Sequence, residues 1–265
     1  MCGQVGIIFG RKRRRPDERD YLREVFIRML LHSEERGPHA SGLAWLKTDG
    51  GHRIFKRPMR AHELVYEKPF QELLGQVDNE TTVLMGHTRW RTRGNEFNNR
   101  NNHPIRAGIV IGTHNGTIYN ADHLFRRLGL PRYAEVDSEL IFRLADRFAP
   151  EGHIDLEGLK KALALCRGQM SAVLASRLDP GTIIVLKGNK PLCLHINRQH
   201  RVVLYASEAA FIDFAVDNEK GWRELEVPPM TMLTIRHEDV RAIENCEFRF
   251  IPQERKGTLP EGVNA

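Results

Sequence analysis

A short apolar run at residues 5–9 lies almost at the start of this 265-residue chain, a few positions after Cys2 and Gly3. A run of this length and composition predicts a buried strand. Most chain termini fray unless they are tied into the core. A core strand at this place therefore holds the residues next to it, Cys2 included, at a fixed position in the fold.

Many short strands, with helices grouped in the middle of the chain, follow this first run. Helical spacing starts at residues 16–17 and ends near the breaker cluster Arg36-Gly37-Pro38. Further helices are expected at residues 61–74, 121–128, 138–148, 156–166 and 208–216. Strands are expected at residues 42–47, 53–55, 81–85, 109–111, 171–176, 182–186, 192–196, 202–206 and 230–235. This order of elements predicts an α+β sandwich and argues against alternating βαβ units.

The composition is that of an ordinary globular protein, with 41% hydrophobic and 28% charged residues. A chain of this length suits one large domain. We expect that domain to span residues 1–252, followed by a flexible tail at residues 253–265, which are polar and contain Gly and Pro. No apolar run reaches the roughly 20 residues that a membrane helix needs, so no membrane partner is expected.

The four cysteines, Cys2, Cys166, Cys193 and Cys246, are widely scattered. They form no CxxC pair and no tight Cys/His spacing, so no metal site is indicated. The chain also lacks the glycine-rich patterns that cradle nucleotides, and no cofactor is expected. Scattered cysteines suit a reducing compartment, and we expect a cytoplasmic protein.

Cys2 carries the most specific chemistry that single residues suggest. If Met1 is removed, which the small side chain at position 2 favours, Cys2 holds both a thiol and a free α-amine with an ordinary pKa of about 7.7–8.0. The amine can accept the thiol proton directly or through one water, which is the arrangement of an N-terminal nucleophile. The alternative is a cysteine that stands at position two without a function.

Five segments give this cysteine a context. They are, in order, Met1-Cys2-Gly3, then Arg36-Gly37 with Ser41-Gly42-Leu43-Ala44, Gly86-His87-Thr88-Arg89-Trp90, His114-Asn115-Gly116 and Asp137-Ser138-Glu139. Together they resemble the glutaminase domain of class II glutamine amidotransferases, and most closely that of glucosamine-6-phosphate synthase. Amidophosphoribosyltransferase and asparagine synthetase are similar more distantly. The resemblance covers roughly residues 2–235.

The resemblance implies a four-layer αββα Ntn-hydrolase sandwich that hydrolyses L-glutamine to glutamate and ammonia. The Cys2 thiolate would attack the side-chain amide carbon and form a γ-glutamyl thioester. By similarity, the oxyanion donors are the Asn115 side-chain amide and the Gly116 backbone N–H. Taken alone, Asn115-Gly116 would be read as an ordinary turn.

The resemblance also implies how the free amino acid is held. Arg89 matches the arginine that binds the α-carboxylate, Asp137 the residue that pairs with the α-ammonium, and Thr92 a threonine near the bound amino acid. Arg36 is expected to orient the N-terminus, and Trp90 to wall the pocket. The alternatives are a solvated charge for Arg89, a helix N-cap for Asp137, a structural ion pair for Arg36 and core packing for Trp90. His103-Pro104 and Ser207 are expected to be structural.

Two departures from the family pattern stand out, together with one insertion. Arg93 replaces a small residue or His, and His39-Ala40-Ser41 replaces a stretch that usually contains Asp. The insertion holds Arg11, Lys12, Arg13, Arg14 and Arg15, which account for most of the net charge of +6. We read this basic run as a solvated loop, the alternative being a docking site for an acidic partner or a polyanion. It lacks interleaved aromatic residues, so nucleic acid is not the expected partner.

The leading functional hypothesis is a glutamine amidohydrolase component that passes ammonia to a separate synthase subunit. A second hypothesis is an Ntn-hydrolase that acts on another amide. A third is a non-catalytic binding module that docks through its basic loop.

Overall fold

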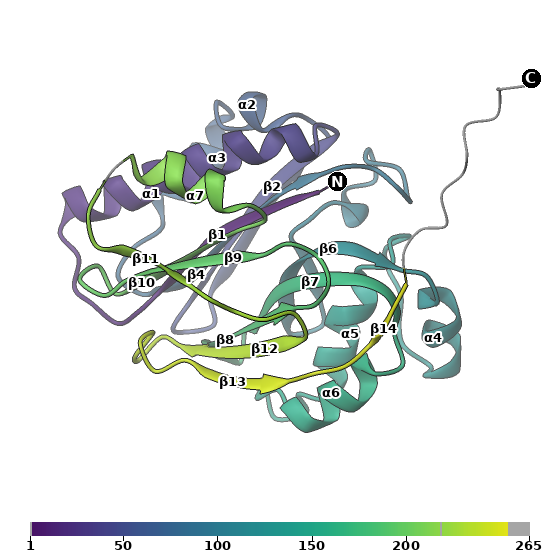
Figure 1. The fold of residues 1–265 in the computed structure, drawn as a ribbon. Coiled ribbons are helices and arrows are strands. Elements are labelled where there is room, and N and C mark those ends of the chain that lie inside the picture. The colour runs from purple at the N-terminus through teal and green to yellow at the C-terminus, as the bar shows by residue number, and fades with distance from the viewer. Residues whose placement is uncertain (1, 218, 254–265) are drawn as a thin grey trace, which may run out of the picture.

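In the computed structural model, which describes residues 2–217 and 219–253, two β-sheets pack face to face and helices cover both outer faces (Figure 1). This arrangement confirms the predicted α+β fold and its four αββα layers. The predicted tail at residues 253–265 lies outside the described residues from position 254 onward.

The first sheet has β1 at its centre. Its strands run in the order β11 (Trp222–Leu225), β9 (Cys193–Asn197), β10 (Val202–Ala206), β1 (Gly3–Phe9), β4 (Thr81–Arg89), β2 (Ala40–Lys47) and β3 (His52–Arg57), and all neighbours are antiparallel. Every residue of β1 is buried. The first described residues are therefore held on both sides by backbone hydrogen bonds, as the apolar run predicted.

The second sheet carries the later half of the chain. Its order is β13 (Glu244–Glu247), β12 (Thr231–Arg236), β8 (Asp179–Lys187), β7 (Arg167–Ser176), β6 (Val110–Ile118) and β5 (Ile105–Ala107), with β14 (Ile251–Pro252) beside the start of β7. The layer between the sheets is apolar and includes Ile8, Met85, Val173, Val185 and Val203.

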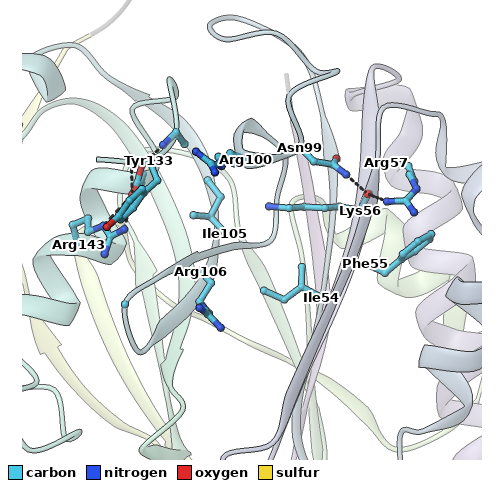
Figure 2. A pocket seen from close by; sticks show the side chains of 13 residues that line it. Ile54, Phe55, Lys56, Arg57, Asn99, Arg100, Ile105, Arg106, Tyr133 and Arg143 are labelled. Atoms are coloured by element: carbon cyan, nitrogen blue, oxygen red, sulfur yellow. Dashed lines mark hydrogen bonds and ion pairs between the residues drawn. The ribbon is translucent and has the colours of Figure 1, made fainter. Parts of the chain in front are cut away.

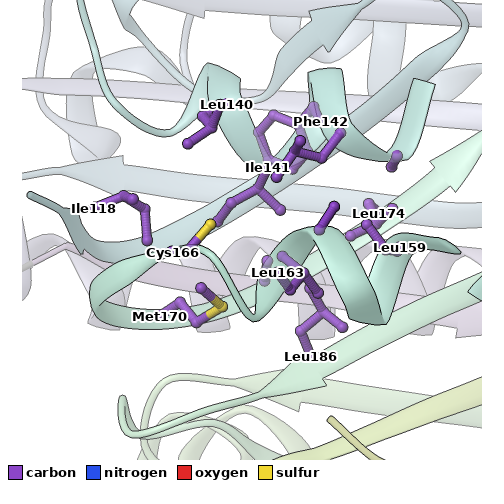
Figure 3. Close-up of a cluster of buried hydrophobic side chains, with 14 of the residues drawn as sticks. Ile118, Leu140, Ile141, Phe142, Leu159, Leu163, Cys166, Met170, Leu174 and Leu186 are labelled. Atoms are coloured by element: carbon purple, nitrogen blue, oxygen red, sulfur yellow. The ribbon is translucent and has the colours of Figure 1, made fainter. Parts of the chain in front are cut away.

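Each outer layer of helices buries its own cluster of side chains. The first sheet is covered by α1 (Pro16–Ser33), α2 (Ala61–Leu64), α3 (Lys68–Gly75) and α7 (Ala209–Val216), and the second by α4 (Ala121–Arg127), α5 (Glu139–Arg147) and α6 (Leu156–Leu163). Short 3-10 helices lie at Glu34–Arg36 and Asn99–Asn101. Figure 3 shows Leu140, Phe142 and Leu163 packing with Cys166 and Leu174 beneath α5 and α6.

The helix predicted at residues 61–74 is wrong as a single element, because it is divided into α2 and α3. Pro69 stands at the start of α3, where its missing N–H costs no helical hydrogen bond. Four strands, β5, β11, β13 and β14, were not predicted. They are short, and β11 and β13 are mostly exposed and polar, so they lack the apolar alternation that marks a strand.

The reading of Asn115-Gly116 as an ordinary turn is also wrong. Both residues lie inside β6, which pairs with β7 so that Asn115 stands opposite Ser171. Gly116 has φ +137°, and a Cβ there would lie 2.0 Å from the carbonyl oxygen of Gln169. Only glycine fits this backbone. No helix among residues 2–217 and 219–253 is long and apolar enough to cross a membrane.

Candidate active site

The residues singled out in the sequence converge at the end of the sandwich where β1 begins and β4 ends. Gly3 of β1 pairs with Thr88 of β4, which places Cys2 beside Arg89 and Trp90. Gly37 packs against the same place: a Cβ on Gly37 would lie 2.5 Å from the carbonyl carbon of Arg89 and 2.6 Å from the Trp90 nitrogen. The Arg36-Gly37 segment therefore contacts the backbone beside the cysteine directly.

Cys2 is held by contacts at both its thiol and its backbone. The Trp90 N–H donates to Cys2 Sγ at 3.2 Å, and the thiol lies 3.5 Å from the Trp90 carbonyl oxygen. Arg36 Nε donates to the Cys2 carbonyl at 2.9 Å, and its guanidinium also forms an ion pair with Glu208. Trp90 itself is 45% exposed, and its ring meets the His39 ring edge-on.

Opposing effects act on the ionisation of this thiol. Burial raises the pKa of Cys2, while the Trp90 hydrogen bond and the Arg89 guanidinium lower it, and the Asp137 carboxylate raises it. Burial dominates, so the resting sulfur is a neutral thiol that needs a base before it can act as a nucleophile. The same balance shows that Arg89 and Asp137 lie close enough to Cys2 to act on it.

Asn115 reaches toward β1 from the other sheet. Its Nδ2 donates to Ser207 Oγ at 2.8 Å, and its Oδ1 is buried without a hydrogen-bond partner in the described part of the chain. Ser207 follows β10 and bonds to β1, because its hydroxyl accepts from the Gln4 N–H at 2.8 Å and its own N–H donates to the Gln4 carbonyl at 2.8 Å. Asn115, Ser207 and the start of β1 thus form one connected unit.

Gln4 forms a second polar connection between the sheets. Its side chain is fully buried, donates to Ser171 Oγ at 2.8 Å and accepts from Thr113 Oγ1 at 2.9 Å. A buried polar side chain in the central strand costs free energy unless its hydrogen bonds are made. Here they are made, and they fix how β6 and β7 sit against the strand that carries Cys2.

Three buried histidines, His87 of β4, His103 before β5 and His114 of β6, lie close to one another. The rings of His87 and His103 stack at 4.2 Å, and His87 Nε2 lies 3.2 Å from the His114 carbonyl oxygen. Burial lowers the pKa of His87 to about 3 and also lowers the pKa values of His103 and His114. All three rings are therefore neutral at pH 7. A neutral His87 that faces a carbonyl through Nε2 carries its proton there, which leaves Nδ1 as an acceptor.

Arg89 is buried, and the loop that follows β4 uses part of its guanidinium. It donates to Asn102 Oδ1 at 2.8 Å, to the Gly94 carbonyl at 2.9 Å and to the Arg93 carbonyl. A guanidinium has five N–H donors, so these bonds leave part of the fork for a ligand. The alternative reading of Arg89 as a solvated charge is wrong, because the residue is 3% exposed.

Asp137 and Thr92 differ in burial. Asp137 is buried, and its carboxylate accepts from the Ile118 N–H at 2.6 Å, at the end of β6. The N-cap of α5 is Ser138, so the reading of Asp137 as the cap of this helix is wrong. Thr92 lies exposed on the loop after Trp90.

Arg93 and one residue of the basic run have structural contacts. Arg93 forms an ion pair with Asp122 of α4 at 2.9 Å. Within the basic run, Arg14 is buried and donates to the carbonyls of Gly10, His200 and Arg201. The expectation of a solvated loop is therefore wrong for Arg14, whose pKa burial lowers to about 10.

From the sequence, Ser207 was expected to be structural only, and Gln4 and Asn102 were not predicted to contribute to the site. One signal for Gln4 was available, since it is a polar residue that directly precedes the apolar run of a core strand. Ser207 and Asn102 carry no such signal. Among the residues that the structure describes, no group of three or more His, Cys, Asp or Glu side chains could hold a metal ion.

No family model matches the chain, but individual proteins are similar to it. The glutamine–fructose-6-phosphate aminotransferases (isomerizing) of Staphylococcus epidermidis and Staphylococcus aureus are 29% identical over 212 residues and 30% identical over 213 residues. Each match covers 79% of this chain and 32% of the relative, so the chain spans about a third of the length of these curated relatives.

Two solved structures share the fold. One is glutamine phosphoribosylpyrophosphate amidotransferase from Bacillus subtilis, with a TM-score of 0.68 and 24% identity. The other is described as the allosteric regulatory enzyme of purine biosynthesis, with a TM-score of 0.69 and 22% identity. Each match covers 94% of this chain and 49% of the other. The aminotransferase relatives and this shared fold confirm the family inferred from the five segments: the chain carries a class II glutamine amidotransferase domain of the Ntn-hydrolase type.

Proposed function

We propose that this domain, over residues 1–252, hydrolyses L-glutamine to glutamate and ammonia with Cys2 as the nucleophile. The observation that carries the proposal is the convergence of two distant segments, at Arg89-Trp90 and at Asp137, on one thiol. The Trp90 N–H donates to Cys2 Sγ, and the charges of Arg89 and Asp137 both act on the same sulfur. A thiol next to a cation and an anion from separate segments suits the reaction of a free amino acid.

The first half of the reaction forms a thioester. With Met1 removed, the Cys2 α-amine accepts the thiol proton while sulfur attacks the side-chain amide carbon of glutamine. The carbonyl electron pair moves to oxygen and gives a tetrahedral oxyanion. The amine then returns the proton to the amide nitrogen, the C–N bond breaks and ammonia leaves. The γ-glutamyl group remains on sulfur.

The second half regenerates the thiol. Water attacks the thioester carbon and gives a proton to the amine, and a second tetrahedral oxyanion forms. When it collapses, the C–S bond breaks, the sulfur recovers a proton and glutamate is released. The high pKa that burial gives the resting thiol makes the amine necessary in this scheme, because little thiolate exists before it acts.

Both oxyanions need donors in place before the reaction starts. We assign this role to Asn115 and to the Gly116 N–H. The Asn115 Nδ2 group carries two hydrogens, and Ser207 Oγ accepts only one of them. The link to Ser207, which is itself bonded to Gln4, fixes the amide relative to β1.

Arg89, Asp137 and Thr92 are proposed to hold the amino-acid end of glutamine. Arg89 keeps part of its guanidinium fork for the α-carboxylate, and the buried Asp137 carboxylate pairs with the α-ammonium. Arg36 orients the nucleophile through its bond to the Cys2 carbonyl, and Trp90 walls the pocket.

We further propose that the ammonia passes to a synthase on a separate chain. The curated relatives, of which this chain spans about a third, are named as aminotransferases that use glutamine, which supports a nitrogen acceptor. Two other readings are distinguished by substrate. An Ntn-hydrolase for another amide would cleave N-acyl compounds faster than glutamine, and a binding module would cleave neither.

The decisive experiment is mass spectrometry of the purified chain before and after a glutamine-like diazoketone. We expect loss of Met1 and addition of one label on Cys2. The matched control is Cys193→Ala, since Cys193 is also a half-buried cysteine, and this variant should label and hydrolyse glutamine as the original chain does. Cys2→Ala should fold, take no label and hydrolyse no glutamine. Hydrolysis by Cys2→Ala, or by protein that keeps Met1, would disprove the mechanism.

A further inference from the structure

A cleft away from Cys2 lies where the edges of the two sheets meet. It has a volume of about 700 Å³ and is lined from the first sheet by β3 and from the second by β5 and the start of α5. Figure 2 shows the side chains of Ile54 and Lys56 pointing from β3 toward Ile105 and Arg106, whereas Phe55 and Arg57 point to the other side of the strand. None of the residues assigned to glutamine hydrolysis lines this cleft.

The cleft is strongly basic. Lys56, Arg57, Arg100 and Arg106 line it, and none of them forms an ion pair with a carboxylate of the described residues. The acidic residue in the lining is Glu139, which is already neutralised. Its carboxylate bonds to Arg143 at 2.9 Å and accepts from the Tyr133 and Ala134 N–H groups.

Three of these cations contact neutral groups. Lys56 Nζ donates to the carbonyls of Asn102 and Pro104 at 2.5 and 2.8 Å. Arg57 stacks over Phe55 with 4.6 Å to the ring centroid, and Arg106 lies 3.3 Å from His52 Nε2. Lys56, Arg100 and Arg106 therefore face one space without a counter-charge from a carboxylate of the described residues, which favours an anionic ligand.

A second basic cavity, beside the run at residues 11–15, lacks this property. Glu80 and Glu238 stand among its cations, and Lys12 is paired with Glu18 at 2.5 Å. The lining of that cavity therefore contains carboxylates of its own, whereas the carboxylate that lines the cleft at the sheet edges, Glu139, is already bonded to Arg143.

The shape and chemistry of the cleft restrict the anion. Arginine forks bind phosphate oxygens in pairs, and three of the four cations are arginines. Ile54, Ile105 and the 64% exposed Tyr133 add apolar and aromatic surface for the body of a ligand. A volume of this size is typical of small-molecule sites, which span roughly 300–1,000 Å³.

We propose that this cleft binds a phosphorylated small molecule, with Arg100 and Arg106 on the phosphate and Tyr133 beside the rest of the ligand. The size of the space favours a sugar phosphate or a nucleotide over a bare ion.

The cleft is connected to Arg89 by one residue. Lys56 donates to the Asn102 carbonyl, and Arg89 donates to the Asn102 side-chain oxygen. Burial and the nearby Arg89 lower the pKa of Lys56 to about 7, so its charge responds to an added anion. This link to glutamine rests on the proposed function, whereas binding in the cleft does not.

Isothermal titration of the whole chain tests the site directly. The probes are AMP, glucose 6-phosphate and inorganic phosphate. We expect one of the two organic phosphates to bind with a Kd at least tenfold below that of inorganic phosphate. Arg100→Gln with Arg106→Gln should weaken this binding at least tenfold. Arg13→Gln, the matched control in the other basic cavity, should change it less than twofold.

Two results would overturn the proposal: no saturable binding of any probe, or equal losses in the control and in the double variant. Arg100 and Arg106 are exposed, so both variants should fold, and thermal unfolding checks that they do. To test the connection between the cleft and Arg89, the Kd of the tighter-binding organic phosphate is measured in Cys2→Ala protein with and without glutamine. We expect at least a twofold difference. An unchanged Kd would disprove the link and leave the site itself to be judged by the first titration.

Discussion

Asn115 and Ser207, 92 positions apart, meet through a 2.8 Å hydrogen bond that joins the two sheets next to the nucleophile. Ser207 also accepts from the Gln4 N–H. A side chain expected to be only structural therefore fixes the amide proposed to stabilise the oxyanion.

Ser207→Ala should lower kcat for glutamine about tenfold and leave KM nearly unchanged, because the loosened Asn115 amide matters most when charge develops on oxygen. The matched control is Ser171→Ala, which removes another fully buried hydroxyl that bonds to Gln4. Both variants should lose about 1–3 kcal/mol of unfolding free energy. Steady-state kinetics and denaturant unfolding measure the two effects. Equal losses of kcat in the two variants would argue against a positioning role for Ser207.

Arg89→Lys should raise KM for glutamine at least tenfold, because an ammonium cannot reproduce the planar fork that binds a carboxylate. The substitution also removes bonds to Asn102 and to the Gly94 carbonyl, so a loss of thermal stability is expected as well. Asn102→Asp keeps the acceptor for Arg89 but loses the Nδ2 bonds to the Glu96 carbonyl and to Asn99, so it measures how much of the KM change a disturbed loop can cause. An unchanged KM in Arg89→Lys would disprove its assigned role.

Gly37→Ala should damage both stability and glutamine hydrolysis. Its Cβ would lie 2.5 Å from the Arg89 carbonyl carbon, so the peptide that donates to Cys2 Sγ must move. Overpacking of this kind typically costs about 1–3 kcal/mol. Gly75→Ala is the control, since a Cβ there meets open space near the end of α3. The comparison uses thermal unfolding and the rate of diazoketone labelling. Full labelling in Gly37→Ala would show that the backbone at Arg89 and Trp90 can shift without disturbing the thiol.

Stability should fall as the pH drops below 6.5, and the buried histidines explain why. The pKa of His87 is about 3 in the folded chain and about 6.5 in the unfolded chain. Between these values the unfolded state binds the extra proton, so the stabilising contribution is complete above pH 6.5 and is lost as the pH falls toward 3. The cost is up to about 1.4 kcal/mol per pH unit for each such histidine.

Denaturant unfolding at pH 7.5 and pH 5 measures this loss. In His87→Gln the change in unfolding free energy between the two pH values should be smaller by about 2 kcal/mol, because glutamine does not titrate there. An equal pH dependence in both proteins would show that His87 is protonated or hydrated in the folded state.

The central elements could be predicted because their signals are local. The apolar run of β1 and the helical spacing of Leu22, Phe26 and Met29 in α1 need no tertiary information. The edge strands β11 and β13 could not, because the backbone of a neighbouring strand, and not their own side chains, makes them strands. The same holds for the extension of β6 through Asn115 and Gly116, which the pairing with β7 decides.

The site divides in the same way. Cys2, Arg89, Asn115 and Asp137 stand in short segments that resemble a known family, so they could be named in advance. Ser207 and Asn102 act through contacts with residues 203 and 13 positions away in the sequence, at Gln4 and Arg89, and no local pattern announces such contacts. The basic cleft joins β3 to β5 and α5 and is visible only when the two sheets are assembled.

The central place of β1 has a consequence for how the protein is made. Gln4 bonds to Ser207, and β1 is flanked by β4 on one side and β10 on the other. The ribosome delivers Cys2 first, yet the last of these neighbours emerges about two hundred residues later. Until then β1 lacks one of its two neighbouring strands and the Ser207 hydroxyl that holds Asn115, so the proposed site is complete only when translation of the fold is nearly finished.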